Sequence, residues 1–406
     1  MKGGLTRPPV RIAWTDHLVE LVGQAAAAAA RIAAAPDQAR RALATSATRE
    51  WARLSARLDG SPLTEETAAA IDAGAVPAAL AARVEAHEAK GPDPSGGWAT
   101  ALRLDARHLD QLETQDVAAI EYANLLTCAQ LEPQLTQEFF ERPRHALTQL
   151  HAAICRGLVA PDVLGRPRRT AQAVHDGAQG HVLYYAADPD TLPDLLDAFG
   201  RWLANDSATL PTLVLAGVVH ERLLEWQPFE AGNGRLARAA SRVVLRARGL
   251  DPDGLAVPER LLAADATGYY REVSATRRRR GELSGWLERY GEALVAGLES
   301  AAKALVSPPA VEVPRRAMAV IDGLAPPGTI TLREYAEAAG VTFATARNEL
   351  QTCVVAGVLE RQPRASGLRF RLPAGHGPTA LEDASARGVR TDGAGLRGGN
   401  DSMRED

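Results

Sequence analysis

The chain has 406 residues, of which 46% are hydrophobic. A chain of this length is usually too long to fold around one compact core, so two or three domains are expected. With 46 Lys and Arg against 50 Asp and Glu, the net charge of -4 excludes a bulk attraction to nucleic acid or anionic lipid, and any site for a polyanion must be local.

The cysteines and the N-terminal stretch indicate the cellular compartment in which the protein is expected. Cys128, Cys155 and Cys353 are widely spaced, which fits neither a disulfide framework nor a zinc site. The first residues lack the pattern of a signal peptide, and the alanine-rich stretch at 25–35 is too short and too weakly apolar to span a membrane. These features predict a cytoplasmic protein with no membrane partner.

Helical patterns dominate the first 300 or so residues. Residues 14–58 are dense in Ala, Leu and Arg, which favours helix, and Pro36 is expected to break this stretch into two. The sequence GPDPSGG at 91–97 has the composition of a loop, after which apolar residues return at helical spacing. One exception is AQGHVLYYAADP, residues 178–189, where β-formers between Gly and Pro predict a short hairpin.

The C-terminal part changes in composition. The prolines of LVSPPAVEVP predict a stiffened linker, and the Gly-rich, charged sequence beyond Pro373 predicts disorder. The expected organisation is then described by five ranges: an N-terminal helical region at 1–115, a helical core at 116–304, a linker at 305–313, a small domain at 314–373 and a disordered tail at 374–406.

The stretch QPFEAGNGRLAR carries the strongest chemical signal. Gly232, Asn233 and Gly234 allow the backbone to aim several N–H groups into one concavity just before a new helix, whose N-terminus and dipole favour anions. Arg235 and Arg238 share a face of that helix, and each has the geometry to hold two phosphate oxygens. The pattern predicts a phosphate cradle; the alternative is a glycine turn between two core helices with solvated arginines.

The same stretch, extended to QPFEAGNGRLARAASR, resembles the signature of the Fic (fido) family, H-P-F-x-D/E-G-N-G-R-x-x-R. Family members transfer AMP from ATP to a hydroxyl side chain of a target protein. The preceding segment, GRPRRTAQAVHDGAQGHVLYYAADPDTLPDLLDAFGRWL, is similar to the family's β-hairpin flap region, which places His181, Val182 and Leu183 in the flap. The later segment YYREVSATRRRRGELSGWLERY is similar to the helices that follow. The resemblance covers roughly residues 116–300 and implies a mainly α fold with a Fic core and a short hairpin flap.

Two positions depart from the family pattern. The family histidine, the general base toward the incoming hydroxyl, falls on Gln227, and an amide has no titratable nitrogen. The family acid that holds Mg²⁺ falls on Ala231, whose methyl cannot ligate, so no metal site is expected there. With the cradle intact, the resemblance implies a protein that binds ATP or another nucleotide but is impaired in AMP transfer, and that couples this binding to its C-terminal domain.

Other residues are candidates to replace the missing groups. Glu230, next to the empty metal position, is a possible displaced acid, and His181 and His220 are candidate bases. An active transferase, which moves AMP or another phosphate-containing group to a protein hydroxyl, therefore stays open as an alternative. A further alternative is a DNA-binding regulator that uses the Fic core as a scaffold.

Far upstream, LSARLDGSPLT is similar to the inhibitory-helix motif of the family, S/T-x-x-x-E-G/N, with Ser55, Asp59 and Gly60 at the motif positions. In the family this acid pairs with the second signature arginine and blocks the γ-phosphate. The resemblance thus implies an N-terminally inhibited protein with a contact between Asp59 and Arg238, expected to be looser because aspartate is one methylene shorter than glutamate. The alternative is an ordinary helix end with a glycine C-cap.

Residues 331–372 resemble a winged helix-turn-helix, with a short helix, a turn, a second helix and an alternating hairpin. Thr342, Thr345, Arg347 and Asn348 would open the second helix, where they could meet base edges or phosphates of DNA. Such modules also bind proteins, so both kinds of partner stay open. The arginine run at 277–280 has helical spacing and is expected to be a solvated face rather than a nucleic-acid patch.

Overall fold

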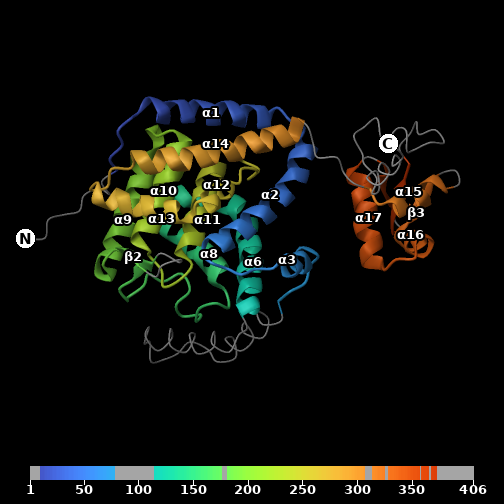
Figure 1. Cartoon of the computed structure of the whole chain (residues 1–406), viewed down its shortest axis with the longest axis horizontal. Coiled ribbons are helices and arrows are strands. Elements are labelled where there is room, and N and C mark those ends of the chain that lie inside the picture. The colour runs from blue at the N-terminus through green and yellow to red at the C-terminus, as the bar shows by residue number, and fades with distance from the viewer. Residues whose placement is uncertain are drawn as a thin grey trace, which may run out of the picture. The chain divides into compact units, whose positions relative to one another are not determined.

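The structure is a computed structural model of the chain and describes these residues: 10–77, 114–175, 181–306, 313–324, 328–356, 358–364 and 367–372. The chain divides into two compact units, Met1–Val306 and Ser307–Asp406. In the described part of the first unit nearly every regular element is a helix, which confirms the predicted mainly α fold (Figure 1). The tail predicted at 374–406 and the loop predicted at 91–97 lie outside the described residues.

The first unit contains the following helices: α1 (Asp16–Ala33), α2 (Asp37–Leu58), α3 (Glu65–Asp72), α6 (Thr114–Leu131), α7 (Glu138–Glu141), α8 (Pro143–Cys155), α9 (Leu192–Asn205), α10 (Thr212–Trp226), α11 (Asn233–Ala247), α12 (Glu259–Ala264), α13 (Ala266–Arg278) and α14 (Ser284–Val306). Short 3₁₀ turns lie at Glu132–Leu135, Pro189–Thr191 and Ser207–Thr209. Helix α14 runs to Val306, into the stretch predicted as linker. Pro36 precedes α2 and separates it from α1, as the sequence predicts.

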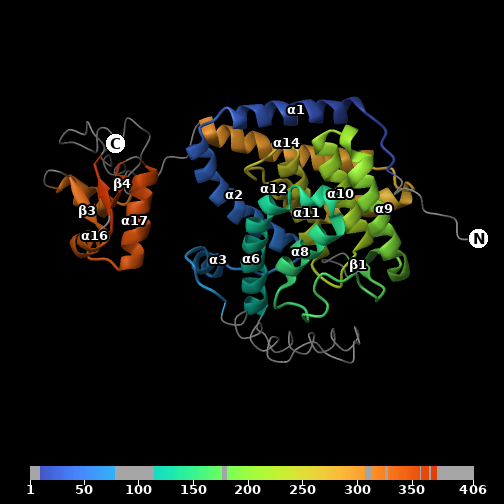
Figure 2. The same cartoon turned by 180° about the vertical axis from the view of Figure 1, so that it is seen from behind.

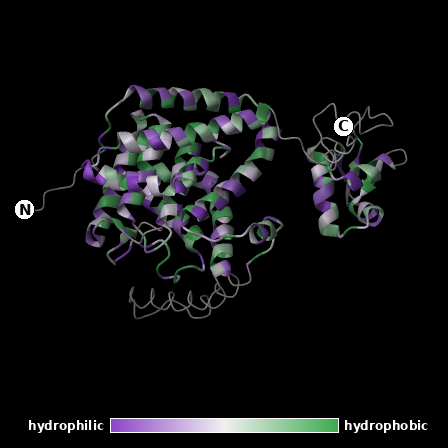
Figure 3. Cartoon of the chain, in the orientation of Figure 1, coloured by the Kyte–Doolittle hydropathy of each residue, from purple (hydrophilic) through white to green (hydrophobic). Residues whose placement is uncertain are grey.

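Helices α1 and α14 run side by side along one edge of the unit (Figures 1 and 2). Thr15 caps α1 by accepting a hydrogen bond from the Leu18 N–H at 3.1 Å, which satisfies one of the free donors of the first turn. The buried residues of α1 recur at steps of three and four, at Leu18, Leu21, Ala25, Ala28 and Ile32. Hydrophobic and hydrophilic residues therefore alternate along this outer helix (Figure 3).

Helices α10 and α11 form the centre of the unit and pack against each other. Helix α10 is buried on nearly every side, which its apolar run LVLAGVV allows. A side chain at Gly217 would place its Cβ 2.7 Å from Leu287 of α14, so glycine lets the two helices approach closely. The loop that joins α10 to α11 holds the candidate site and is thus supported by two largely buried helices.

A two-stranded antiparallel hairpin lies beside this core. It consists of β1 (Ala173–His175) and β2 (Val182–Tyr185), with Ala173 opposite Tyr185. The hairpin predicted within 178–189 locates the second strand correctly, but the first strand lies N-terminal to that stretch. Tyr184 fastens β2 to the core, because its hydroxyl donates to the carbonyl oxygen of Leu224 in α10 at 2.9 Å.

Among the described residues, no single helix is long and apolar enough to cross a membrane. Helices α1 and α2 taken together are long and apolar enough by length and composition alone, but a bend of 120° separates them.

The second unit has its own hydrophobic core and is described by itself. Its elements are α15 (Arg315–Asp322), β3 (Thr329–Thr331), α16 (Leu332–Ala339), α17 (Phe343–Val355), β4 (Glu360–Arg364) and β5 (Gly367–Arg371). The three strands pair antiparallel in the order β3-β5-β4. Gly340 ends α16 in the left-handed region, with φ 64°, and Thr342 caps α17. The sequence predicts the two helices at 332–355 and the hairpin, but not α15 or β3.

Candidate functional site

The α10–α11 loop begins and ends in left-handed backbone. Helix α10 stops at Gln227, whose φ of 46° is unusual for a residue with a Cβ, and α11 starts after Gly232, with φ 70°. The amide of Gln227 turns back on its own helix and donates to the carbonyl oxygen of Leu224 at 2.9 Å. The residue at the family's base position is therefore engaged in ending α10.

Asn233 ties the loop into a compact turn. Its side-chain oxygen accepts from the Phe229 N–H at 2.9 Å, and its amide donates to the Phe229 carbonyl oxygen at 2.6 Å. A side chain at Gly232 would place its Cβ 2.5 Å from the Cys155 sulfur, which, with the left-handed φ, requires glycine. Asn233 and Gly232, both predicted as cradle residues, thus shape the loop through contacts within the protein.

His151 supports the same loop from α8, although no motif in the sequence marks this residue. Its ring stacks on Phe229 with 4.1 Å between centroids, its Nδ1 accepts from the Gly165 N–H at 2.8 Å, and its Nε2 donates to the Ala231 carbonyl oxygen at 3.2 Å. Burial is the main cause that lowers the pKa of His151 to about 4, so the ring is neutral at neutral pH.

Arg238 is the more deeply buried of the two signature arginines. Its Nε donates to the Ser55 hydroxyl at 2.7 Å, and its Nη2 donates to the Ser55 carbonyl oxygen at 2.8 Å and to Asp59 Oδ1 at 2.7 Å. The contact between Asp59 and Arg238 that the resemblance implies is present. It is not loose, because 2.7 Å is a normal length for a hydrogen bond between charged groups.

Arg235 lies beside it and also meets Asp59. Its Nε is 3.3 Å from Asp59 Oδ2, and its Nη1 is 3.1 Å from Glu121 Oε1 on α6. Tyr270 donates its hydroxyl to Asp59 Oδ1 at 3.2 Å. Both arginines are buried, so the alternative of solvated arginines on a glycine turn is wrong.

The carboxylate of Asp59 sits directly over the start of α11. A Cβ on Gly234 would lie 2.5 Å from Asp59 Oδ1 and 3.2 Å from Nη1 of Arg238. Burial would raise the pKa of Asp59, but the charges of Arg238 and Arg235 outweigh it and the pKa is lowered. Burial would lower the pKa of the Arg238 guanidinium, but the charge of Asp59 outweighs burial and the pKa is raised. An internal carboxylate therefore lies beside both arginines at the start of α11.

Residues 142–245, which contain this loop and both arginines, match the model of the Fic/DOC family. This segment is a Fic domain. A Fic family protein from Desulfovibrio desulfuricans G20 has a similar fold, with a TM-score of 0.54, 19% identity, and coverage of 91% of this chain and 100% of that one. A Fic domain protein from Bacteroides thetaiotaomicron aligns with a TM-score of 0.48, 16% identity, and coverage of 72% of this chain and 96% of that one.

A third solved structure, Fic-1 (residues 134–508) from C. elegans, aligns with a TM-score of 0.49 and 14% identity over 71% of this chain and 72% of that one. No curated protein matches the sequence.

Arg168 clamps the loop of the Fic domain and was missed by the sequence analysis. Its guanidinium donates to main-chain carbonyl oxygens on three segments: Gln227 at 2.6 Å, Trp226 at 3.1 Å, Thr170 at 2.5 Å and Ala187 at 2.5 Å. The positive charge of Arg168 at the C-terminus of α10 also interacts favourably with the negative end of the helix dipole. Arg168 therefore connects the end of α10 with both sides of the hairpin.

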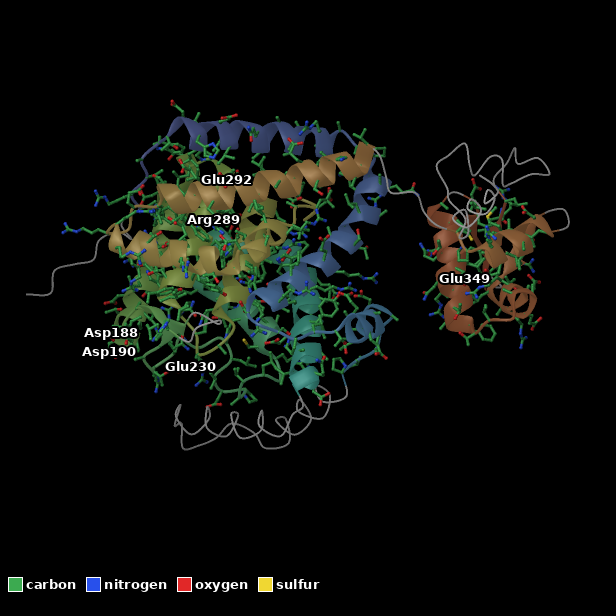
Figure 4. All side chains as sticks on the ribbon, viewed as in Figure 1. Asp188, Asp190, Glu230, Arg289, Glu292 and Glu349 are labelled. Carbon is green, nitrogen blue, oxygen red and sulfur yellow. The ribbon has the colours of Figure 1, made fainter. Side chains whose placement is uncertain are left out.

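Glu230, the possible displaced acid, does not point toward the arginines. Thr170 donates its hydroxyl to Glu230 Oε2 at 2.7 Å, and the N–H of Arg169 donates to Oε1 at 3.2 Å. Figure 4 shows Glu230 low in the first unit, on the side of the hairpin. Its carboxylate is engaged by the segment that leads into β1.

The two candidate bases have different surroundings. His220 is fully buried among Tyr269, Trp286 and Tyr290, and its Nε2 hydrogen-bonds the Tyr269 hydroxyl at 2.7 Å. Burial lowers the pKa of His220 well below its ordinary value, so this residue is a neutral core histidine with no access to a target hydroxyl. His181 is exposed at the start of β2.

In the flap, Val182 is also exposed, and Leu183 is half-buried. The Leu183 carbonyl oxygen accepts from the Ser274 hydroxyl at 3.0 Å. The arginines at 277–280 are exposed, as the sequence predicts for a solvated face.

The residues of this Fic domain do not fit Mg²⁺. Ala231 has no oxygen ligand in its side chain, the carboxylate of Glu230 is turned to Thr170, and Asp59 is paired with two arginines. Among the residues that the structure describes, no group of three or more His, Cys, Asp or Glu side chains is arranged to hold a metal ion.

In the second unit, α17 presents the predicted contact residues at its N-terminal half. Thr342, Arg347 and Asn348 are exposed and Thr345 is half-buried. The hydroxyl of Thr342 accepts from the Thr345 N–H at 3.2 Å, so these two residues cap the helix. Phe343, the first residue of α17, is 55% exposed.

Proposed function

We propose that the Fic domain binds a nucleotide or another phosphate ligand at the N-terminus of α11, and that Asp59 holds this site closed in the state described here. The observation that carries the proposal is the carboxylate of Asp59, which contacts Arg235 and Arg238 above Gly234. A carboxylate in that place shows how an anion is held there. A phosphate that displaced Asp59 would meet the same donors.

The chemistry of the site supports an external anion. The start of α11 carries a partial positive charge, and the lack of a Cβ at Gly234 leaves its backbone open to close approach. Nη1 of Arg238 is buried without a hydrogen-bond partner in the described structure. An unpaired buried donor is unfavourable, so a ligand that accepts from it gains from the contact.

The same residues explain why AMP transfer would be impaired. A general base near the incoming hydroxyl typically contributes about 10² to 10⁴ in rate, and the Gln227 amide cannot accept a proton. That amide is also turned to the Leu224 carbonyl oxygen. Ala231 supplies no ligand for Mg²⁺, and Glu230 is held by Thr170. An active transferase with displaced groups would need these contacts to rearrange.

The test is calorimetric titration of the full chain with ATP, with and without Mg²⁺. We expect weak binding to the wild type, binding at least about tenfold tighter to Asp59→Ala because the internal competitor is gone, and none to Asp59→Ala combined with Arg238→Ala. Mg²⁺ should not change these affinities. Glu50→Ala is the matched control, since Glu50 is another carboxylate of α2 that forms an ion pair, with Arg260, away from the site.

Two results would contradict the proposal. Binding that survives the loss of Arg238 would place the ligand elsewhere. Efficient Mg²⁺-dependent labelling of a protein by ATP in the wild type would show that transfer is not impaired.

The exposed start of α17 favours a second function for the other unit. We propose that Thr342, Arg347 and Asn348 contact DNA, because a polar, exposed N-terminal half of a helix next to a three-stranded sheet suits entry into the major groove. Binding of the full chain to labelled duplex DNA, followed by anisotropy at increasing salt, tests this. The absence of salt-sensitive binding would overturn it.

A further inference from the structure

Around the start of α11, the positive charges of the arginines are matched by an equal number of negative charges. Within the described part of the chain, the carboxylates that form ion pairs with Arg235 and Arg238 are Asp59 and Glu121, so two positive charges face two negative ones. Asp59 belongs to the end of α2, whereas Glu121 lies on α6. The two acids are therefore carried by different helices.

Departure of Asp59 alone leaves a small excess of positive charge. Arg235, Arg238 and Glu121 would remain, with a net charge of +1, and the dipole of α11 adds about half a charge. Burial keeps several neighbouring groups uncharged: it raises the pKa of Tyr270 and Tyr269, raises that of Cys155 to about 11 and lowers that of His151 to about 4. Glu230, the acid next to the altered metal position, is held by the Thr170 hydroxyl.

The donors that become free on Arg238 are suited to one phosphate group. Asp59 now occupies one N–H of Nη2 of Arg238, and the adjacent Nη1 has no hydrogen-bond partner in the described structure. After Asp59 leaves, these two nitrogens can donate in parallel to two oxygens of a single phosphate. Glu121 forms an ion pair with Arg235 at 3.1 Å, and its negative charge limits how much further negative charge the site accepts.

We propose that the opened site takes a single phosphate group, as in inorganic phosphate or a nucleoside monophosphate, without a metal ion, and that Glu121 sets this preference over a triphosphate. The inference rests on the proposed function and adds the class of ligand. A phosphate monoester carries about -1.5 to -2 charges at neutral pH, close to what the site neutralises. A triphosphate carries roughly two more, which other nucleotide sites share with Mg²⁺.

The experiment compares ligands on the full chain with Asp59→Ala. Inorganic phosphate, AMP and ATP are titrated by calorimetry, with and without Mg²⁺. We expect AMP to bind at least as tightly as ATP and Mg²⁺ to have no effect. Adding Glu121→Gln should then shift the ATP-to-AMP affinity ratio toward ATP by about tenfold, because one negative charge close to the site is removed.

Glu50→Gln in the Asp59→Ala background is the matched control, since it removes the same charge from an ion pair with Arg260 on another face, and it should leave the ratio unchanged. ATP binding more than about tenfold tighter than AMP before Glu121 is changed, or dependence on Mg²⁺, would overturn the single-phosphate inference and leave the proposed function standing. An unchanged ratio in Glu121→Gln would remove the role of Glu121. Failure of every ligand to bind Asp59→Ala would overturn both proposals.

Discussion

The Nε of Arg168 lies 2.6 Å from the carbonyl oxygen of Gln227, at the point where α10 ends and the left-handed turn begins. The same guanidinium reaches the carbonyl of Ala187 beyond the hairpin. One buried side chain therefore holds the conformation of the signature loop and its position relative to the flap.

Replacing Arg168 with Ala should destabilise the first unit. Four carbonyl oxygens would lose their donor, and each buried carbonyl left without a partner costs about 1 to 3 kcal/mol, although water can reach some of them. We expect the free energy of unfolding to fall by roughly 3 kcal/mol, measured by urea denaturation. Arg166→Ala, an exposed arginine two residues earlier, should change it by less than about 0.5 kcal/mol. If both substitutions lowered the free energy of unfolding equally, the contacts of Arg168 with the loop would not be what stabilises the unit.

His151 should make the stability depend on pH in a defined window. Its pKa is about 4 in the folded state and about 6.5 in the unfolded chain, so below pH 6.5 the unfolded state takes up a proton that the folded state does not. The stability associated with the neutral ring is present above pH 6.5 and is lost as the pH falls to about 4, by roughly 3 kcal/mol.

His151→Gln keeps a donor and an acceptor but does not titrate. We expect the difference in free energy of unfolding between wild type and this variant to shift in favour of the variant between pH 6.5 and pH 4. A difference that stays constant over this range, in parallel denaturation series, would mean that His151 titrates normally.

Restoring the family residues at the two altered positions should restore AMP transfer. Gln227→His tolerates the left-handed backbone, because His is among the residues found there more often, and Ala231→Asp supplies a carboxylate at a half-buried position. In the Asp59→Ala background we expect the double substitution to raise Mg²⁺-dependent incorporation of AMP from labelled ATP by at least about a hundredfold. Either single substitution should give much less. No gain from the double variant would mean that more than these two positions prevents catalysis.

Arg347→Ala should weaken DNA binding by the second unit. In the proposed DNA complex the exposed Arg347 would donate to a base edge or to a phosphate, so its loss should lower affinity about tenfold. Arg333→Ala removes the same charge from the exposed face of α16, where Arg333 pairs with Glu337, and should have little effect. Anisotropy with labelled duplex DNA separates the two cases, and equal weakening by both variants would indicate attraction by charge alone.

The sequence predicted the start of α11 and the contact of Asp59 with Arg238. The glycines, Asn233 and the two arginines stand in one continuous stretch, and the contact of Asp59 with Arg238 followed from a motif that the chain resembles. Arg168, His151 and Glu121 were not predicted, because each is a single residue whose partner in the α10–α11 loop or on α11 lies 59 to 114 positions away and whose spacing carries no pattern. The one signal for Glu121 was an acid in an apolar helical stretch, which is usually solvated.

In the fold as well, features within one continuous stretch were predicted and features that depend on distant residues were not. Long helices with regular apolar spacing were predicted, whereas β3 has three residues and depends on pairing with β5 some 40 residues later. Strand β1 was missed for the same reason, since its register is determined by β2 rather than by its own short sequence.

The missing side chain at Gly234 has a consequence for how the protein responds to its ligand. Because Asp59 lies where a Cβ would be, an external anion and the internal carboxylate cannot occupy that place together. Under the proposed function, Asp59 would act as a tethered competitor with a high effective concentration, and the ligand concentration needed to fill the site would depend on how firmly the last turn of α2 is held. Substitutions along α2 that never touch the ligand would move this threshold up or down while leaving the intrinsic affinity of the open site unchanged.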